Sequence, residues 1–457
     1  MTNQLPTTFL WGNSTSSMQT EGGQNLGGRG PSIYDQRSAG PSNMDWSTAI
    51  DEYHRYEEDF DLMHEMGVTC YRFQIGWSRV CPTGDGNFNP EGIAFYQHLI
   101  EALLDRDITP MICLYHFDMP LALAQKYNGF LSRHVVDAFV RFGKRMVDEF
   151  APIVPYWITF NEQNLYTTSN ARIYAGCLEG GTSDEEILTI TNHVMSAHAQ
   201  IANYLHNTTK AKIGGMLAYE EVYASTANPL DNQYARKIDE FSNRNLMDVF
   251  VRGRYSNEVM TYVKNNRLDI DLTEQDKAAF TQLTSDYIAF SYYRSDLIDS
   301  SLVPINTSPL RYLDFGNVRN PYTRSNEWHW NVDPIGFRDI LTKVYNAYGL
   351  PLFPIENGLG IREPDTDEEI QDDYRIDYHR QHLQSMKDAI FKDGVQVLGY
   401  LAWGLIDIPS SSGNMDKRYG AVYVNRTNQE VRDLRRIPKK SFNWFKQVFT
   451  SNGQHLN

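Results

Sequence analysis

The stretch Phe353-Pro354-Ile355-Glu356-Asn357-Gly358 has the pattern of a short apolar strand that ends in a carboxylate. Strands of a parallel sheet are covered on both faces, so they appear as brief apolar runs without polar alternation. The Asn-Gly pair that follows favours a turn and predicts that the strand stops there. Because parallel barrels carry their chemistry at the carboxyl ends of the strands, we expect Glu356 to lie in a functional site.

A second stretch, Tyr156-Trp157-Ile158-Thr159-Phe160-Asn161-Glu162, has the same design. It is an apolar strand that ends in an asparagine and a glutamate. A single glutamate after a strand is more often a solvated loop residue. Two of them at two strand ends, each beside an asparagine, indicate a pair that faces one pocket. Glycoside hydrolysis requires such a pair of carboxylates.

Apolar stripes at helical spacing alternate with short apolar strands along most of the chain, which favours a parallel sheet built from βα units. One helical stripe starts near Asp51 and stops at Gly67. We expect a single α/β domain, residues 1–457, folded as a (β/α)8 TIM barrel with long βα loops over its C-terminal face. The eight candidate strands are Phe9–Ser14, Cys70–Ile75, Pro110–Tyr115, the strand before Asn161, Ile213–Leu217, Tyr287–Tyr292, Leu352–Ile355 and Val397–Trp403.

Two long irregular stretches, residues 295–330 and 361–374, are expected to be loops over the barrel mouth. The first contains Tyr322, Trp328 and Trp330. These rings would suit stacking on sugars, and packing within the loop is an equally good interpretation.

Composition excludes several classes of function. The chain has 457 residues, 41% of them hydrophobic, which is enough for a large core. A net charge of −15 argues against nucleic acid and anionic membranes as partners. No apolar run is long enough for a transmembrane helix, and the first residues do not have the pattern of a secretory signal.

The four cysteines are Cys70, Cys81, Cys113 and Cys177, and no CxxC spacing occurs. A zinc site or a redox pair is therefore not expected. Cys70 and Cys113 lie in apolar strand-like runs and are predicted to be small core residues. These features favour a cytoplasmic protein.

With these strands and motifs in order, the chain resembles glycoside hydrolase family one, the β-glucosidase and phospho-β-glycosidase group of (β/α)8 barrels. The resemblance extends from Phe9 to Phe445. It rests on Phe9–Gly12, Gln19 with Glu21-Gly22, Tyr71–Phe73 with Trp77–Arg79, Tyr115-His116, Thr159–Glu162, Tyr292-Tyr293, Glu356–Gly358, Trp403 and Ser441–Phe445.

The resemblance implies that Glu162 is the acid/base and Glu356 the nucleophile, with no metal and no cofactor. Chemistry agrees: a neighbouring Arg72 would keep Glu356 ionised, while a poorly solvated Glu162 near that charge would keep its proton. The resemblance further implies a glycone site formed by Gln19, His116, Asn161 and Trp403, and contacts to the nucleophile from Arg72 and Tyr293.

Structural interpretations stay open for some of these residues. Arg72 would also suit a buried ion pair of the barrel, Trp403 a core aromatic, and His116 a strand-end histidine with satisfied hydrogen bonds. The sequence also departs from the family pattern at four positions near the motifs. Phe117 replaces the usual Trp, Gln163 the common Pro, Ser291 the usual Asn and Ile355 the usual Thr.

The departure with most bearing on specificity follows Trp403. Enzymes of this family that act on unphosphorylated sugars have a Glu and a Trp where this chain has Ser410 and Ser411. A carboxylate would repel a phosphate carrying roughly −1.5 to −2 charge, whereas a serine accommodates it. Ser410, Lys417 and Tyr419 resemble the Ser, Lys and Tyr that bind phosphate in the phospho-β-glycosidases.

The same loop leaves some choices open. Arg418 occurs in both groups of enzymes and is expected to be structural. A Trp follows the serine in 6-phospho-β-galactosidases, so Ser411 favours gluco over galacto substrates. Ser411 or Ser412 is an alternative to Ser410 as the phosphate ligand.

We therefore expect a retaining 6-phospho-β-glucosidase that releases glucose 6-phosphate by a two-glutamate double displacement. Its partner would be a small phosphorylated β-glucoside. The alternatives are an unphosphorylated-sugar β-glucosidase or β-galactosidase, a 6-phospho-β-galactosidase, and an inactive sugar-binding barrel. The sequence leaves the aglycone preference and a homo-oligomeric state open.

Overall fold

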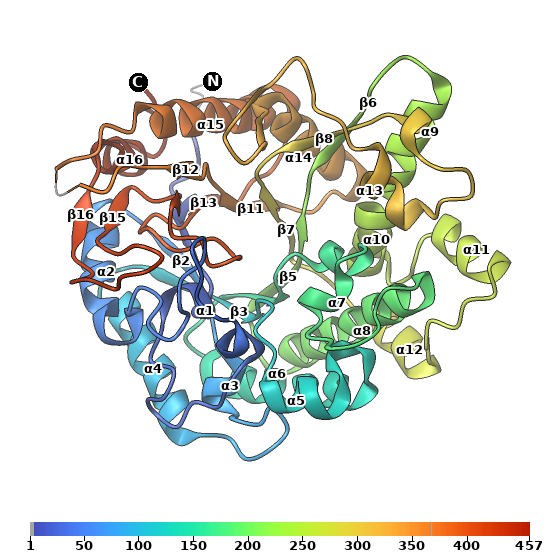
Figure 1. The fold of residues 1–457 in the computed structure, drawn as a ribbon, viewed down its shortest axis with the longest axis horizontal. Coiled ribbons are helices and arrows are strands. Elements are labelled where there is room, and N and C mark those ends of the chain that lie inside the picture. The colour runs from blue at the N-terminus through green and yellow to red at the C-terminus, as the bar shows by residue number, and fades with distance from the viewer. Residues whose placement is uncertain (1–3, 367) are drawn as a thin grey trace.

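The computed structural model describes residues 4–366 and 368–457, and a barrel of eight parallel strands lies at its centre (Figure 1). Neighbouring strands pair in the order β11-β7-β5-β4-β3-β2-β1-β13. A single parallel bridge between Leu352 and Val397 joins the two ends of this order. The strands are β1 (Leu10–Ser14), β2 (Cys70–Gln74), β3 (Thr109–Tyr115), β4 (Tyr156–Phe160), β5 (Lys212–Ala218), β7 (Tyr287–Tyr292), β11 (Leu352–Asn357) and β13 (Gly399–Trp403).

All eight predicted strands are present, and the predicted fold class is confirmed. Helices follow the strands and surround the barrel on the outside (Figure 1). Ser132 caps the start of α6 by accepting a hydrogen bond from the His134 N–H, and a capping box of Ser183 and Glu186 starts α8. The surrounding helices include α2 (Glu52–Glu65), α4 (Pro90–Leu104), α6 (Arg133–Phe150), α8 (Asp184–Thr208), α10 (Asn245–Arg252), α14 (Pro334–Tyr348), α15 (Asp373–Asp393) and α16 (Lys440–Thr450).

The barrel interior is filled by side chains, as expected for a TIM barrel. Cys70 and Cys113 are fully buried in this interior, which confirms their prediction as core residues. They pack with Met111, Ile158, Met216, Tyr287, Ala289, Phe353, Ile355 and Leu401.

The stretch 295–330 is more regular than predicted. It begins with β8 (Ser295–Ile298), which pairs in parallel with β6 (Glu221–Ala224) and continues the course of the barrel strands β7 and β5 beyond the rim. It also contains the short helix α13 (Tyr312–Gly316). The sequence-based expectation of an irregular loop was wrong here, because Ser295 and Asp296 interrupt the apolar run by which we recognised strands.

Within residues 4–366 and 368–457, no helix is both long and apolar enough to cross a membrane.

Candidate active site

Glu356 and Glu162 lie in one cavity at the carboxyl ends of the barrel strands. Glu356 belongs to β11, whose pairing with β7 shifts register between Pro354 and Glu356. Such bulges often redirect a side chain beside an active site. Glu162 follows β4 and adopts a left-handed backbone with φ of 44°, which few residues other than glycine adopt. The cavity has a volume of about 240 Å³ and is lined by Gln19, His116, Phe117, Glu162, Leu165, Tyr174, Ala218, Glu220, Ser291, Tyr293, Arg294, Trp330, Glu356, Trp403, Ser411 and Tyr419.

Both carboxylate oxygens of Glu356 accept a hydrogen bond. The Arg72 guanidinium, from β2, donates to Oε1 at 2.7 Å, and the Tyr293 hydroxyl, which follows β7, donates to Oε2 at 2.9 Å. Arg72 also donates to Asn161 Oδ1 at 2.7 Å. The predicted contacts of Arg72 and Tyr293 with Glu356 are therefore present. The contact between Arg72 and Glu356 is also the buried ion pair that the structural interpretation of Arg72 predicted.

The two glutamates differ in their electrostatic surroundings. Burial and the nearby Glu356 charge raise the pKa of Glu162 to about 8. Burial also raises the pKa of Glu356, but the Arg72 charge and the Tyr293 hydrogen bond act in the opposite direction. Glu162 is therefore the carboxyl group that keeps a proton at neutral pH, and Glu356 is the better stabilised anion.

The sequence did not indicate the partner of Glu162. Ser291, at the end of β7, donates a hydrogen bond from Oγ to Glu162 Oε1 at 2.5 Å. In the sequence, Ser291 stands out only as a departure from the family pattern. Its position at a strand end was the one signal that could have placed it in the site.

The predicted glycone residues surround the two glutamates. His116 stacks on Trp403 with ring centroids 5.6 Å apart, and both rings line the cavity. Burial and the Arg72 charge lower the pKa of His116 well below its usual range, so the ring is neutral. The Asn161 Nδ2 group is buried and has no hydrogen-bond partner within the described part of the chain. Such an unpaired donor is available to a ligand.

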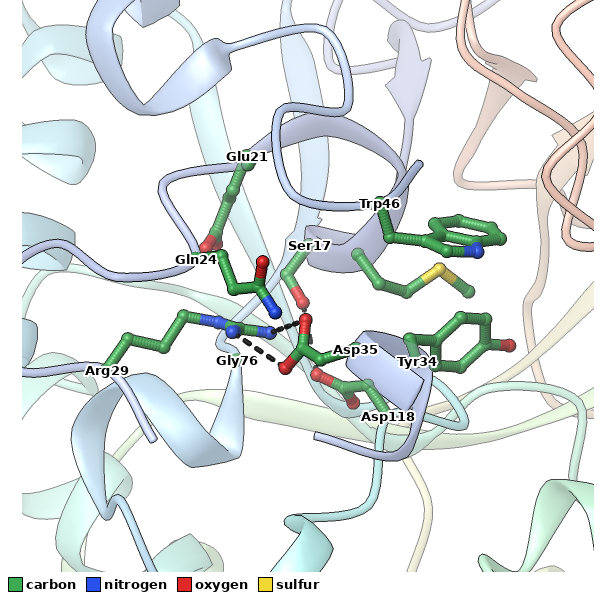
Figure 2. Close-up of a pocket in the computed structure, with 11 residues that line it drawn as sticks. Ser17, Glu21, Gln24, Arg29, Tyr34, Asp35, Trp46, Gly76 and Asp118 are labelled. Atoms are coloured by element: carbon green, nitrogen blue, oxygen red, sulfur yellow. Dashed lines mark hydrogen bonds and ion pairs between the residues drawn. The ribbon is translucent and has the colours of Figure 1, made fainter. Parts of the chain in front are cut away.

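Gln19 is held on the cavity wall by a short helix, α1 (Ser17–Thr20). Its Nε2 group donates to the Pro409 carbonyl oxygen at 2.7 Å. Ser17, in the same turn, donates from Oγ to Gln74 Oε1 at 2.9 Å and to Asp118 Oδ2 at 3.3 Å. Figure 2 shows Ser17 and Asp118 in this polar cluster beneath the turn. The cluster ties α1 to β2 and to the segment after β3.

Lys417, in β14 (Lys417–Arg418), is 5% exposed and has an unusual environment. Its Nζ atom lies 3.4 Å from the ring centroid of Trp330, which lines the cavity, and 5.3 Å from that of Trp328. No described residue forms a salt bridge or a hydrogen bond with this ammonium group. Burial and the Arg294 charge lower the pKa of Lys417 to about 8.

The serines of this loop have different surroundings. Ser410 is buried, and its Oγ lies 2.8 Å from Ser412 Oγ and accepts a hydrogen bond from the Asn414 N–H at 3.2 Å. Ser411 lines the cavity together with Tyr419. The structure thus brings Tyr419 and Ser411 to the cavity, whereas Ser410 and Lys417 lie behind its wall.

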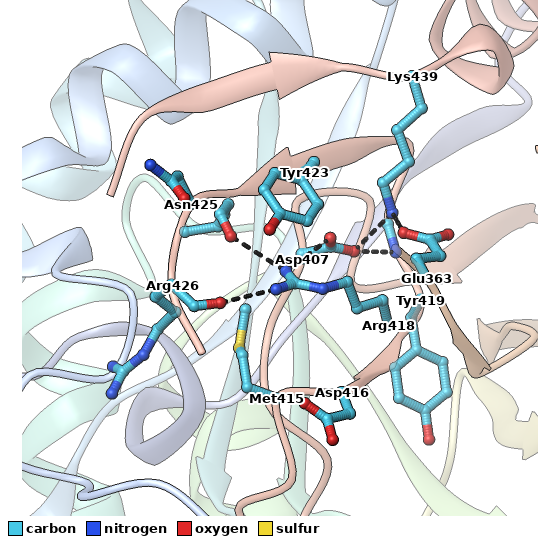
Figure 3. A network of polar contacts seen from close by, with 12 residues as sticks. Glu363, Asp407, Met415, Asp416, Arg418, Tyr419, Tyr423, Asn425, Arg426 and Lys439 are labelled. Atoms are coloured by element: carbon cyan, nitrogen blue, oxygen red, sulfur yellow. Dashed lines mark hydrogen bonds and ion pairs between the residues drawn. The ribbon is translucent and has the colours of Figure 1, made fainter. Parts of the chain in front are cut away.

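Arg418 points into a buried ion network rather than toward the cavity, as expected for a structural residue (Figure 3). It forms a salt bridge with Asp407 at 3.1 Å and donates to the carbonyl oxygens of Val424 and Arg426. Lys439 joins Asp407 to Glu363 at 3.0 and 2.5 Å. The network fixes the loop that carries Lys417.

The three aromatic residues predicted to lie over the barrel mouth are found in different places. Trp330 lines the catalytic cavity and Trp328 lies near Lys417. Tyr322 is 95% exposed and lines a different surface hollow, so it does not belong to this site.

A parallel eight-stranded barrel with two glutamates in a cavity at its carboxyl ends defines the class of barrel glycoside hydrolases. The model of the family described as "Glycosyl hydrolase family 1" matches residues 1–454. The chain belongs to glycosyl hydrolase family 1.

Relatives and solved structures match over nearly the full length. The chain is 36% identical to the "Aryl-phospho-beta-D-glucosidase BglA" of Bacillus subtilis (strain 168), over 99% of both chains. It is 36% identical to the "Phospho-cellobiase" of Klebsiella oxytoca, again over 99% of both chains. It superposes on the family 1 β-glucosidase from Thermotoga maritima with a TM-score of 0.88 at 27% identity, over 99% of each chain.

Proposed function

We propose that this protein is a retaining 6-phospho-β-glucosidase, which cleaves 6-phospho-β-glucosides to glucose 6-phosphate and an aglycone or sugar. The observation that carries the phosphate specificity is Lys417, a buried cation with no anionic partner among the described residues, in contact with an aromatic wall of the cavity. A buried charge is costly unless it is paired. A phosphate group of the substrate supplies the missing anion.

The first step forms a covalent intermediate. Glu356 attacks the anomeric carbon while Glu162 donates its proton to the glycosidic oxygen, so that the aglycone leaves as an alcohol. The raised pKa of Glu162, about 8, keeps that proton available at neutral pH. Arg72 and Tyr293 hold one oxygen each of Glu356 and orient the carboxylate for attack.

The second step hydrolyses the glycosyl-enzyme bond. Glu162, now ionised, takes a proton from a water molecule that attacks the anomeric carbon, and Glu356 leaves as a carboxylate. The buried Asn161 Nδ2 donor binds the sugar 2-hydroxyl, a contact that strengthens in the transition state. Gln19, His116 and Trp403 bind the remaining face of the glycone.

Phosphate binding uses the loop behind Trp330. The Lys417 ammonium exchanges the indole face for phosphate oxygens, which are stronger partners because the hydrogen bonds are charge-assisted. Tyr419 and a serine of residues 410–412 donate the remaining hydrogen bonds. Ser411 already faces the cavity, whereas Ser410 must give up its contact with Ser412.

The names of the two relatives with phospho-glucosidase and phospho-cellobiase activity support this proposal. A phosphorylated sugar carries a permanent charge and does not cross membranes unaided, so we place the reaction in the cytoplasm, where an uptake system that phosphorylates its sugar would deliver the substrate.

The deciding experiment compares p-nitrophenyl β-glucoside with its 6-phosphate as substrates of the wild-type protein. We expect the phosphorylated compound to have the higher kcat/KM. The reverse preference would leave an ordinary β-glucosidase, and the 6-phosphogalactoside measured alongside would reveal a galacto enzyme. Binding of every compound without turnover would leave an inactive sugar-binding barrel.

Stereochemistry tests the mechanism separately. NMR spectra recorded immediately after mixing should show the β-anomer of the product first, as a double displacement requires. An initial α-anomer would contradict the nucleophilic role of Glu356.

A further inference from the structure

The two carboxyl oxygens of Glu162 have unequal surroundings. Oε1 accepts the hydrogen bond that Ser291 donates from Oγ at 2.5 Å. Oε2 has no hydrogen-bond partner within residues 4–366 and 368–457, and Glu162 lines the catalytic cavity. The protein therefore occupies one oxygen of this carboxyl group and leaves the other to a ligand.

Ser291 is held firmly between two neighbouring strands. It belongs to β7, which lies between β5 and β11 in the barrel (Figure 1). Its register partners on these strands are Ala218 and Glu356, and its carbonyl oxygen accepts a hydrogen bond from the Tyr219 N–H at 3.0 Å. Only one carbon separates the fixed backbone from the hydroxyl, so Oγ has few alternative positions.

The donor and acceptor roles follow from what else the Ser291 hydroxyl can contact. A protonated carboxyl group has one oxygen that donates and one that accepts. If Glu162 donated a proton from Oε1 to Ser291, the hydrogen of the Ser291 hydroxyl would be buried without an acceptor, because Oγ has no other partner in the described part of the chain. An unsatisfied buried donor costs free energy. Ser291 is therefore the donor, and the proton of Glu162 lies on Oε2.

The same hydrogen bond also stabilises Glu162 after it has lost its proton. A hydroxyl that donates to an ionised carboxylate forms a stronger, charge-assisted bond. Burial and the Glu356 charge raise the pKa of Glu162 to about 8, and the Ser291 hydrogen bond acts in the opposite direction. Without that bond, Glu162 would hold its proton more tightly and would be a weaker acid toward the leaving group.

We propose that Ser291 is a positioning residue for the acid/base: it keeps the proton of Glu162 on Oε2, where the glycosidic oxygen can take it, and it stabilises the carboxylate that this transfer leaves. Oε2 gives its proton to the glycosidic oxygen as the bond from that oxygen to the anomeric carbon breaks. In the second step, Oε2 takes a proton back from the attacking water. The proposal rests on the proposed role of Glu162 in glycoside hydrolysis, but it does not require the phosphate.

Other titratable groups near Glu162 bear on the design of a test. The charges that act on Glu162 belong to Glu356 on β11, Arg72 on β2 and Glu220 after β5. Lys417 has a pKa of about 8, so its titration must be cancelled in the measurement. The remaining titratable groups of the cavity wall are Arg294, His116, whose ring is neutral, and the hydroxyls of Tyr174, Tyr293 and Tyr419, whose pKa values are raised by burial.

The test uses two substrates that differ only in their leaving group. For wild type and variants, we would measure kcat/KM for methyl and for dinitrophenyl 6-phospho-β-glucoside from about pH 6 to about pH 10. The methoxide leaving group needs a proton from Glu162, whereas an activated phenolate needs little protonation. Lys417 and Glu356 act on both compounds alike, so the methyl-to-dinitrophenyl ratio reports the proton of Glu162. A poorly folded preparation lowers both values alike and leaves the ratio unchanged.

In the wild type, the ratio should fall as the pH rises through about 8, the pKa of Glu162. In Ser291→Ala, the ratio at neutral pH should be about tenfold lower, because the proton is no longer held on Oε2. The midpoint of the fall should move up by about one pH unit, because the carboxylate has lost a donor. Ser291→Thr keeps the hydroxyl and should stay close to wild type in both quantities. An unchanged ratio and midpoint in Ser291→Ala, or an equal loss on both substrates, would overturn the proposal.

Ser196→Ala is the matched control. Ser196 is also a buried serine that donates to a carboxylate oxygen at 2.5 Å, in this case Asp276 Oδ1, and it does not line the catalytic cavity. Its removal takes away a comparable buried hydrogen bond and should leave the ratio and the midpoint as in wild type. A shift as large as that in Ser291→Ala would show that the contact with Glu162 is not its cause, and the proposal would fail.

The wild-type profile separates this inference from the proposed function. A ratio that falls with pH in wild type but does not respond to Ser291→Ala leaves the glycosidase mechanism intact and overturns the role of Ser291. If the wild type prefers the unphosphorylated methyl and dinitrophenyl β-glucosides, the phosphate proposal fails, and the same ratio on those compounds still tests Ser291. A wild-type ratio that is independent of pH would overturn the acid/base role of Glu162 and the role of Ser291 together.

Discussion

Two buried cations lie near the proposed glycone site, and they differ in what they contact. Arg72 is completely buried, and it donates to Glu356 and to Asn161 at 2.7 Å each. Lys417 is 5% exposed and contacts the face of Trp330 without a carboxylate partner among the described residues. The charge of Arg72 is thus already used by the protein. The charge of Lys417 has no such partner among the described residues. Under the proposed function, Arg72 and Glu356 belong to a catalytic region, and Lys417 belongs to a recognition region that binds the phosphate.

The largest expected effect belongs to the catalytic region. Glu356→Gln removes the proposed nucleophile and should lower kcat/KM by about 10⁴-fold or more, equally for the phosphorylated and the unphosphorylated glucoside. Steady-state rates on both substrates measure this. If kcat/KM fell for only one of the two substrates, Glu356 would contribute to substrate recognition and not only to catalysis.

Glu162→Gln should have the next largest effect, and it should depend on the leaving group. General acid catalysis typically contributes about 10²–10⁴-fold, and an activated phenolate needs little protonation. Methyl or sugar aglycones should therefore lose far more activity than dinitrophenyl ones. Equal losses across a leaving-group series would assign the proton to another residue.

Lys417→Ala should act on recognition alone. It should lower kcat/KM for the phosphorylated glucoside by about ten- to a hundredfold, because a hydrogen bond to a charged group contributes about 1.5–3 kcal/mol. The unphosphorylated substrate should change little. Ser410→Glu should impair the phosphorylated substrate even more, since it adds a like charge beside the phosphate. Equal losses on both substrates would contradict the phosphate site.

Arg418→Met is the matched control, because Arg418 is the adjacent cation of the same strand. Its salt bridge to Asp407 is buried, so its loss should lower the free energy of unfolding by about 3 kcal/mol. The preference between the two substrates should change far less than in Lys417→Ala, because Asp407 keeps its contact with Lys439 and continues to hold the loop. Denaturant unfolding of both variants would show a large change for Arg418→Met and a small one for Lys417→Ala.

The smallest expected effect is on pH dependence. Glu162, with a pKa of about 8, is protonated below that pH, so activity on both substrates should fall as the pH rises through about 8. Lys417, with a pKa of about 8, loses its charge over the same range. The phosphorylated substrate should therefore lose up to about tenfold more kcat/KM at pH 9. In Lys417→Ala the two profiles should coincide; a persistent gap would exclude Lys417 as its source.

The barrel could be predicted from the sequence, because each strand is a short apolar run that can be recognised from adjacent residues alone. Glu162 and Glu356 could be placed at strand ends for the same reason, and the structure brings them into one cavity. The prediction that residues 295–330 form an irregular loop was wrong. The strand β8 starts with polar residues, so the sequence gives no sign of its pairing with β6.

Contacts between distant segments could not be predicted from local patterns. Trp330 and Lys417 are far apart in the sequence, and only the folded loops bring the indole to the ammonium group. The contact of Ser291 with Glu162 depends likewise on the arrangement of β4 and β7 around the barrel. Glu220 and Arg294, which line the same cavity and form a salt bridge at 2.8 Å, belong to no sequence motif that could have revealed the pair.

The contact between Lys417 and Trp330 also offers a way to follow ligand binding by tryptophan fluorescence. An ammonium group on the face of an indole perturbs the electrons of the ring, and a ligand that draws the ammonium away removes that perturbation. If phosphate binds Lys417 as proposed, the tryptophan emission should change on binding, and this change would report binding even of compounds that the protein does not cleave. The chain has eight tryptophans, so the contribution of this one is isolated by subtracting the signal of a Trp330→Phe variant.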